Sequence, residues 1–125
     1  MSPLAPAIFV FEKSPRWESE LKRRSRNGRV LVRPCRTAAD VIALARQVPG
    51  SVVVLDLAAG AAEGLQLLEA LFRLRAGIFP VVIASRVTQD LEWPARELGA
   101  AHFTTDSISG EVLADICRRF LVADS

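Results

Sequence analysis

A chain of 125 residues, of which 50% are apolar and 24% charged, has the length and composition of one globular domain with its own core. Its formal net charge of +2 is too small to indicate nucleic-acid binding by itself. No apolar run approaches the ~18 residues of a membrane span, and the opening MSPLAP lacks the pattern of a signal peptide. The two cysteines, Cys35 and Cys117, have neither metal-ligand nor redox-motif spacing, which predicts reduced thiols in or near the core. We therefore expect a flexible segment over residues 1–6, a single domain over 7–122, a cytoplasmic location and no membrane partner.

Five short apolar runs alternate with segments that carry helix-start and helix-stop residues. None of the runs alternates between polar and apolar residues, so each is expected to be a strand covered on both faces, as in a parallel sheet between helix layers. Joined by right-handed crossovers, these elements predict a three-layer α/β sandwich. The predicted strands are residues 7–11, 29–33, 51–57, 79–85 and 100–104.

Residues that favour helix starts and stops, together with the spacing of apolar residues, predict the helices. Ser14 and Pro15 suit the N-cap and first position of the first helix, and Gly28 suits its stop. Thr37 and Asp40 form a start like a capping box for the second. The predicted buried faces are Val41, Ile42, Leu44, Ala45 and Val48 in the second helix, Leu65, Leu68, Leu71 and Phe72 in the third, and Val112, Leu113, Ile116, Phe120 and Leu121 in the fifth.

The fourth helical segment, VTQDLEWPARELGA, contains a proline at its centre. Inside a helix, Pro94 would remove one hydrogen bond and clash with the preceding turn. The sequence leaves two alternatives: a helix kinked at Pro94, or a helix that begins near Trp93 and leaves TQDLE as a loop.

Polar side chains lie at the carboxyl ends of four of the predicted strands. They are Glu12, Asp56, Ser85 and Asp106. In an open parallel sheet, ligands bind beyond the carboxyl ends of the strands, so this acidic pocket could serve a divalent cation or phosphoryl chemistry. The alternative is that each residue caps the helix that follows it. Capping is a weaker explanation for Asp56, because this residue precedes its loop and does not stand at a helix start.

The spacing of these residues resembles that of a response-regulator receiver domain (CheY-like), the phosphoacceptor module of two-component and phosphorelay signalling. Asp56 ends the third strand, Gly64 opens the apolar helix GLQLLEAL, and Ser85 ends PVVIAS. The segment LGAAHFTTDS is similar to the family's Gly-Ala-x-x-Tyr stretch, with Phe103 as the aromatic residue. The resemblance implies a flavodoxin-like (βα)5 fold with strand order 2-1-3-4-5, Asp56 as phosphoacceptor candidate, and Ser85 and Phe103 in switch-like positions.

The residues around Asp56 depart from the family pattern. Receivers hold Mg²⁺ with an acidic pair after the first strand, where this chain has Phe11 and Glu12. The family lysine after the last strand is replaced by Asp106, or by Thr105 if the correspondence slips by one residue, and neither is cationic. The small residue after the family threonine or serine is replaced by Arg86. Phosphoryl transfer needs positive charge to offset the charge that develops on the oxygens, so these changes oppose it. The sequence thus indicates a degenerate, pseudo-receiver member with no required cofactor, in which Arg86 or Lys13 forms an ion pair with Asp56.

Two other functions remain open at this point. The chain could be a conventional receiver, phosphorylated on Asp56, with Glu12 and Asp56 holding Mg²⁺ and Arg86 as the cation. It could also be a small metal-dependent phosphohydrolase, although no second aspartate follows Asp56 at the usual spacing, no general base is evident and no cap domain excludes water. We therefore expect no enzyme. The basic stretch 21–29 is read as a solvated helix surface, and nucleic acid is not an expected partner.

Partner binding is expected on the side of the chain that receivers use for contacts. Trp93, His102 and Phe103 fall on that side. An exposed Trp93 would favour an interface, and a buried one would only fill the core. The partners implied are a histidine kinase or a downstream signalling protein, with a homodimer as a further alternative.

Overall fold

The computed structural model describes residues 5–25 and 30–123. Its strands are β1 (Ile8–Phe11), β2 (Val32–Cys35), β3 (Val52–Asp56), β4 (Phe79–Ala84) and β5 (His102–Thr105). Its helices are α1 (Trp17–Arg24), α2 (Ala38–Gln47), α3 (Ala61–Leu74), α4 (Glu92–Glu97) and α5 (Gly110–Ala123), with short 3₁₀ turns η1 (Leu57–Ala59) and η2 (Gln89–Leu91). In this part of the chain no helix is both long and apolar enough to cross a membrane.

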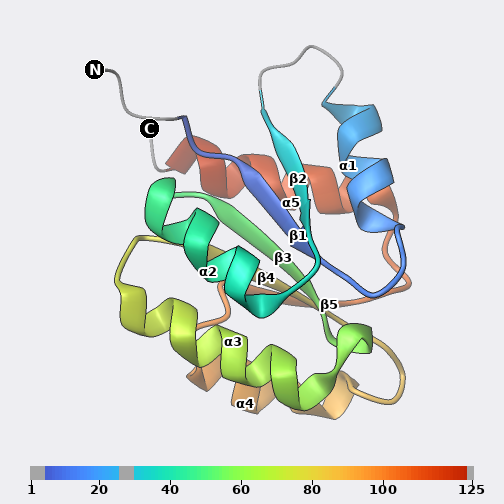
Figure 1. Ribbon diagram of the computed structural model, residues 1–125. Helices are drawn as coiled ribbons and strands as arrows, with labels where there is room; N and C mark the ends of the chain where they lie inside the picture. The colour runs from blue at the N-terminus through green and yellow to red at the C-terminus, as the bar shows by residue number, and fades with distance from the viewer. Residues whose placement is uncertain (1–4, 26–29, 124–125) are drawn as a thin grey trace.

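The sheet has the predicted topology. Its five strands are parallel and run in the order β2-β1-β3-β4-β5. Helices α1 and α5 lie together on one face, and α2, α3 and α4 cover the other (Figure 1). The prediction of a flavodoxin-like (βα)5 sandwich is confirmed.

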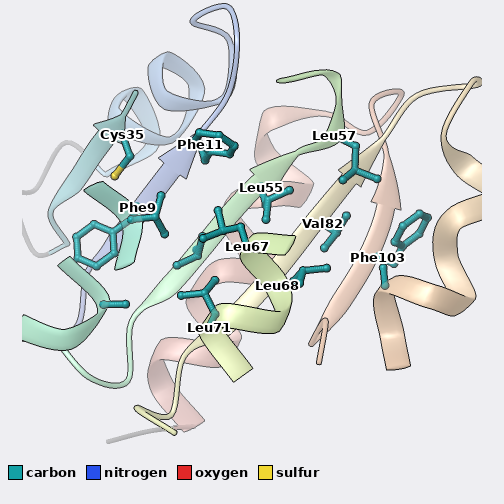
Figure 2. Packing of buried hydrophobic residues seen from close by; sticks show 14 of the residues in the cluster. Phe9, Phe11, Cys35, Leu55, Leu57, Leu67, Leu68, Leu71, Val82 and Phe103 are labelled. Atoms are coloured by element: carbon teal, nitrogen blue, oxygen red, sulfur yellow. The ribbon is translucent and has the colours of Figure 1, made fainter. Parts of the chain in front are cut away.

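Strict alternation of side chains divides the core in two. Phe9, Val53 and Leu55 pack under α2, α3 and α4, in the layer that Figure 2 shows. Val52 and Val54 point the opposite way, into the layer under α1 and α5. Because successive side chains of a strand alternate between faces, the next residue after Leu55 faces α1 and α5. That residue is Asp56, so the strand itself turns the carboxylate toward α1.

Both cysteines are buried thiols, as the sequence predicted. Cys35 lies in the core under α2, and Cys117 lies in the core under α5. Burial raises the pKa of Cys35 to about 11 and that of Cys117 to about 12. The two side chains are therefore neutral and act as small apolar groups.

The second strand and the first helix begin later than predicted. Strand β2 covers 32–35 instead of 29–33, because its register with β1 pairs Val32 with Ile8; Pro34 is tolerated because β2 is an edge strand. Helix α1 begins at Trp17, after Ser14 and Pro15. The predicted stop at Gly28 lies outside the described residues.

Two residues of the predicted buried faces of the helices are exposed. Phe72 is 66% exposed and Val112 is 47% exposed. In α3 the buried positions are Leu67, Leu68 and Leu71, together with Gly64, which lies so close to Leu55 and Leu57 that a side chain would not fit. The ring of Phe72 packs instead against Gly99 at the surface.

The proline in the fourth helical segment does not kink a helix. Helix α4 begins at Glu92, so Pro94 is its third residue. The first turn of a helix has no internal partners for its N–H groups, and proline therefore loses no hydrogen bond there. The alternative of a helix that begins near Trp93 is correct, and the residues before it form η2.

Candidate functional site

Glu12 caps helix α1. Its Oε1 accepts hydrogen bonds from the backbone N–H groups of Arg16 (3.1 Å) and Trp17 (3.0 Å), and its Oε2 accepts one from Glu18 (3.0 Å). The first N–H groups of a helix lack internal acceptors, and the helix dipole favours a negative charge at this end. The capping alternative therefore describes Glu12, although the residue is five positions ahead of the first residue of the helix.

Asp56 is held by a backbone amide and by a buried indole. Its Oδ1 accepts a hydrogen bond from Ala58 N–H (2.9 Å), and its Oδ2 accepts one from Trp17 Nε1–H (3.0 Å). Trp17 is only 1% exposed and packs in the layer under α1 and α5. Each carboxylate oxygen thus has a donor, one of them from a side chain that is excluded from solvent.

Arg16 joins this site to the loop after β5. Its guanidinium lies 3.9 Å from the centroid of the Trp17 ring, and its Nη2 donates a hydrogen bond to the carbonyl oxygen of Asp106 (2.6 Å). The guanidinium therefore covers the indole that binds Asp56. It also connects the start of α1 to the segment between β5 and α5.

The structure offers Asp56 a different partner from the one that the sequence suggested. Among the described residues, no ion pair within 4.0 Å joins Asp56 to Arg86 or Lys13, whose side chains are exposed. Lys13 lines a hollow of about 620 Å³ at the ends of β1 and β2, with Arg36 and Glu63 also in its wall. The sequence analysis missed Trp17. The only signal for it was a large aromatic residue at the start of the helix that covers the face of the sheet to which Asp56 points.

The donor set at this edge does not fit the magnesium site that the resemblance implies. Both oxygens of Glu12 accept hydrogen bonds from N–H groups at the start of α1, and both oxygens of Asp56 accept one hydrogen bond each. Phe11 is 3% exposed and packs in the core beside Leu55 (Figure 2), so it offers no ligand at this edge. Within residues 5–25 and 30–123, no group of three carboxylate, histidine or cysteine side chains forms a metal-binding cluster. The oxygens of Glu12 and Asp56 are thus engaged by donors from the start of α1 and from the loop after β3.

The two residues in switch-like positions, Ser85 and Phe103, lie in different environments. The N–H of Ser85 donates to Thr88 Oγ1 (2.9 Å), and Ser85 Oγ accepts from the N–H of Val87 (3.2 Å), so this side chain is bonded to its own loop. Phe103 is 9% exposed and packs against α4 in the core (Figure 2).

Trp93 and His102 lie at a mixed surface over α4, β5 and α5. Trp93 is 71% exposed, and His102 is half-buried. Burial lowers the pKa of His102, nearby Arg96 and Arg119 lower it further, and Glu92 opposes them. We call this region, defined by Trp93, Arg96, His102 and Arg119, the α4–β5–α5 surface. Phe103, which the sequence grouped with it, belongs to the core instead.

We predict that Asp56→Ala destabilises the protein. The change leaves the buried Trp17 Nε1–H without an acceptor, which costs about 1–3 kcal/mol. Asp56→Asn keeps one carbonyl acceptor and is expected to cost less. Urea unfolding of the three proteins measures the difference. A crowded cluster of like charges would behave in the opposite way, since removal of Asp56 would then stabilise the fold.

The pKa of His102 gives a second prediction. Because this pKa is lower in the folded protein than the ordinary value of about 6.5, the unfolded chain takes up the proton first, and stability falls as the pH drops through about 6.5. NMR titration of the imidazole should give a pKa below the ordinary value. Arg96→Gln should raise it and Glu92→Gln should lower it. An unchanged pKa in both variants would contradict the proposed neighbours.

The chain matches no family model and no curated protein sequence. Solved structures do match it: it is similar to FixJ-N (23% identity, TM-score 0.77, covering 97% of this chain and 96% of that one). It is also similar to the receiver domain of the TMAO respiratory system response regulator TorR (20% identity, TM-score 0.77, covering 96% of this chain and 100% of that one). A third similar structure is a CheY-like receiver domain protein from Methanospirillum hungatei JF-1 (16% identity, TM-score 0.79, covering 96% of each chain). At these identities the likeness establishes the fold, which is that of response-regulator receiver domains.

Proposed function

We propose that this chain is a receiver-like module of two-component or phosphorelay signalling that acts through protein contacts and in which Asp56 is not a working phosphoacceptor. The observation that carries the proposal is the hydrogen bond from the buried Trp17 indole to Asp56 Oδ2, with Ala58 N–H on Oδ1. A carboxylate that serves as a nucleophile must present an oxygen to the phosphodonor. Here each oxygen is already engaged by a donor fixed in the fold.

The charges around Asp56 support the same conclusion. Phosphoryl transfer requires cations to offset the charge on the transferring oxygens. Asp106 stands where receivers keep a lysine, and Phe11, in the place of a metal ligand, is buried in the core. Arg16 is a cation at this edge, and its guanidinium donates to the Asp106 carbonyl and lies over the Trp17 ring.

The α4–β5–α5 surface is the proposed contact face. An indole that is 71% exposed is unusual for a residue of its size, and interface hot spots are enriched in tryptophan and arginine. Trp93 stands on α4 beside Arg96, and His102 lies on the adjacent strand. The proposed partner is a histidine kinase or a downstream signalling protein, with self-association on the same face as the alternative.

Phosphorylation provides the direct test. We expect acetyl phosphate in Mg²⁺ buffer to leave the intact mass of the protein unchanged, because both Asp56 oxygens accept hydrogen bonds from donors fixed in the fold and, among the described residues, no cation pairs with Asp56 within 4.0 Å. Asp56→Asn is the matched control, since it removes the nucleophile and keeps the side-chain shape. A phosphoryl adduct on the wild-type chain that is absent from Asp56→Asn would make the protein a conventional phosphoacceptor.

The contact face is tested by Trp93→Ala. Since the side chain is mostly exposed, we expect the free energy of unfolding to change by no more than about 0.5 kcal/mol. Self-association in sedimentation, or retention of a bound signalling protein in quantitative pull-downs, should fall.

Phe72→Ala is the matched control for this change, because Phe72 is 66% exposed but lies on α3. Equal losses of association in both variants would indicate nonspecific apolar contact. A loss of association in Phe72→Ala alone would place the contact face on α3.

A further inference from the structure

Two residues of α1 and the residue just before it contact either Asp56 or the segment that leads into α5. Trp17 donates to Asp56, and Arg16 reaches the carbonyl of Asp106. One turn further along α1, the carboxylate of Glu20 packs against Gly110, the first residue of α5, so closely that a Cβ atom on Gly110 would collide with it. The loop 106–110 is thus contacted at both ends by α1, the same helix that binds Asp56.

These contacts are specific to the residues present. The hydrogen bond to Asp56 requires an N–H on the buried aromatic ring, which tryptophan has and phenylalanine lacks. The approach of Glu20 requires that residue 110 have no side chain. The guanidinium of Arg16 donates to Asp106 while its Cζ lies over the indole ring; the compact ammonium of a lysine lacks the planar, forked donors that suit both contacts at once.

We propose that α1 is a fixed link between Asp56 and the loop 106–110, in which Trp17 and Arg16 are positioning residues. The carboxylate of Asp56 orients the indole, the indole supports the guanidinium of Arg16, and the guanidinium holds the loop at Asp106. Asp56 therefore fixes the loop that joins β5 to α5 by accepting a hydrogen bond. This inference deepens the proposed function, because it assigns the unphosphorylated carboxylate a continuous role in holding the segment between β5 and α5, two of the elements that carry the α4–β5–α5 surface.

Two backbone amides in the loop report on the link. The N–H of Asp106 donates to the carbonyl of Ala84 (2.7 Å), and the N–H of Ile108 donates to that of Thr105 (3.3 Å). Hydrogen exchange at these amides measures how often the loop opens. The Trp17 indole N–H reports on the bond to Asp56, and the exposed Trp93 provides an internal control in the same spectrum.

The test compares Trp17→Phe, Arg16→Gln and Asp56→Ala with the wild-type chain by amide exchange in NMR. We expect each variant to speed exchange of the Asp106 and Ile108 amides by about tenfold, the size of effect that loss of one charge-assisted hydrogen bond allows. Asp56→Ala should also speed exchange of the Trp17 indole and leave Trp93 unchanged. The double variant Trp17→Phe/Asp56→Ala should exceed neither single variant, because both remove the same bond.

Thr37→Ala is the control for general destabilisation, because it removes the side-chain cap of α2 on the opposite face of the sheet. It should leave the two loop amides unchanged. Where Trp17→Phe fails to fold, Arg16→Gln and Asp56→Ala carry the test. Unchanged loop exchange in Arg16→Gln and Asp56→Ala would overturn the link even if Asp56 resists phosphorylation. Labelling of Asp56 by acetyl phosphate would overturn the proposed function and leave the exchange result to decide the link separately.

Discussion

A carboxylate at the end of a buried strand needs hydrogen-bond donors, and the donors that Asp56 receives organise this edge of the molecule. One comes from its own loop, at Ala58. The other comes from the indole of Trp17 on α1, the helix that packs on the face of the sheet to which Asp56 points. That second donor can reach Asp56 only because Trp17 is buried at the start of α1, and α1 begins there because Glu12 accepts its first N–H groups. Glu12 and Asp56 both accept hydrogen bonds from the start of α1, and Asp56 accepts a second one from its own loop.

In this arrangement the carboxylates are stabilised by N–H donors, where clustered carboxylates would need a bound cation. Clustered carboxylates need a cation to offset their repulsion. Here the negative charges are spread over backbone N–H groups, an indole N–H and the positive end of a helix, while the guanidinium of Arg16 lies over the ring. The site is stable as a set of internal contacts, and the same contacts reduce what it offers to an incoming ligand.

The fold could be predicted from the sequence because continuous apolar runs and helix punctuation repeat five times, and the sheet order followed from the resemblance. The boundaries of β2 could not, since they depend on the register with β1, which pairs Val32 with Ile8. At the site, the position of Asp56 was predictable and its partner was not. Lys13 and Arg86 were expected because they are cations close to strand ends, but exposed side chains of this kind gain little from pairing in water. Trp17 was overlooked because an aromatic residue at the start of a helix indicates only packing. Its indole N–H becomes a donor to the site because β3, which the helix covers, ends in the acceptor Asp56.

The two tryptophans have opposite environments: Trp17 is 1% exposed and Trp93 is 71% exposed. Collisional quenchers in the solvent reach an exposed indole and do not reach one packed in a core, so the fluorescence of the chain separates into two independent signals without any added label. One signal originates beside Asp56 and the other on the α4–β5–α5 surface. The molecule therefore carries an intrinsic optical probe at each of the two regions on which its proposed function depends.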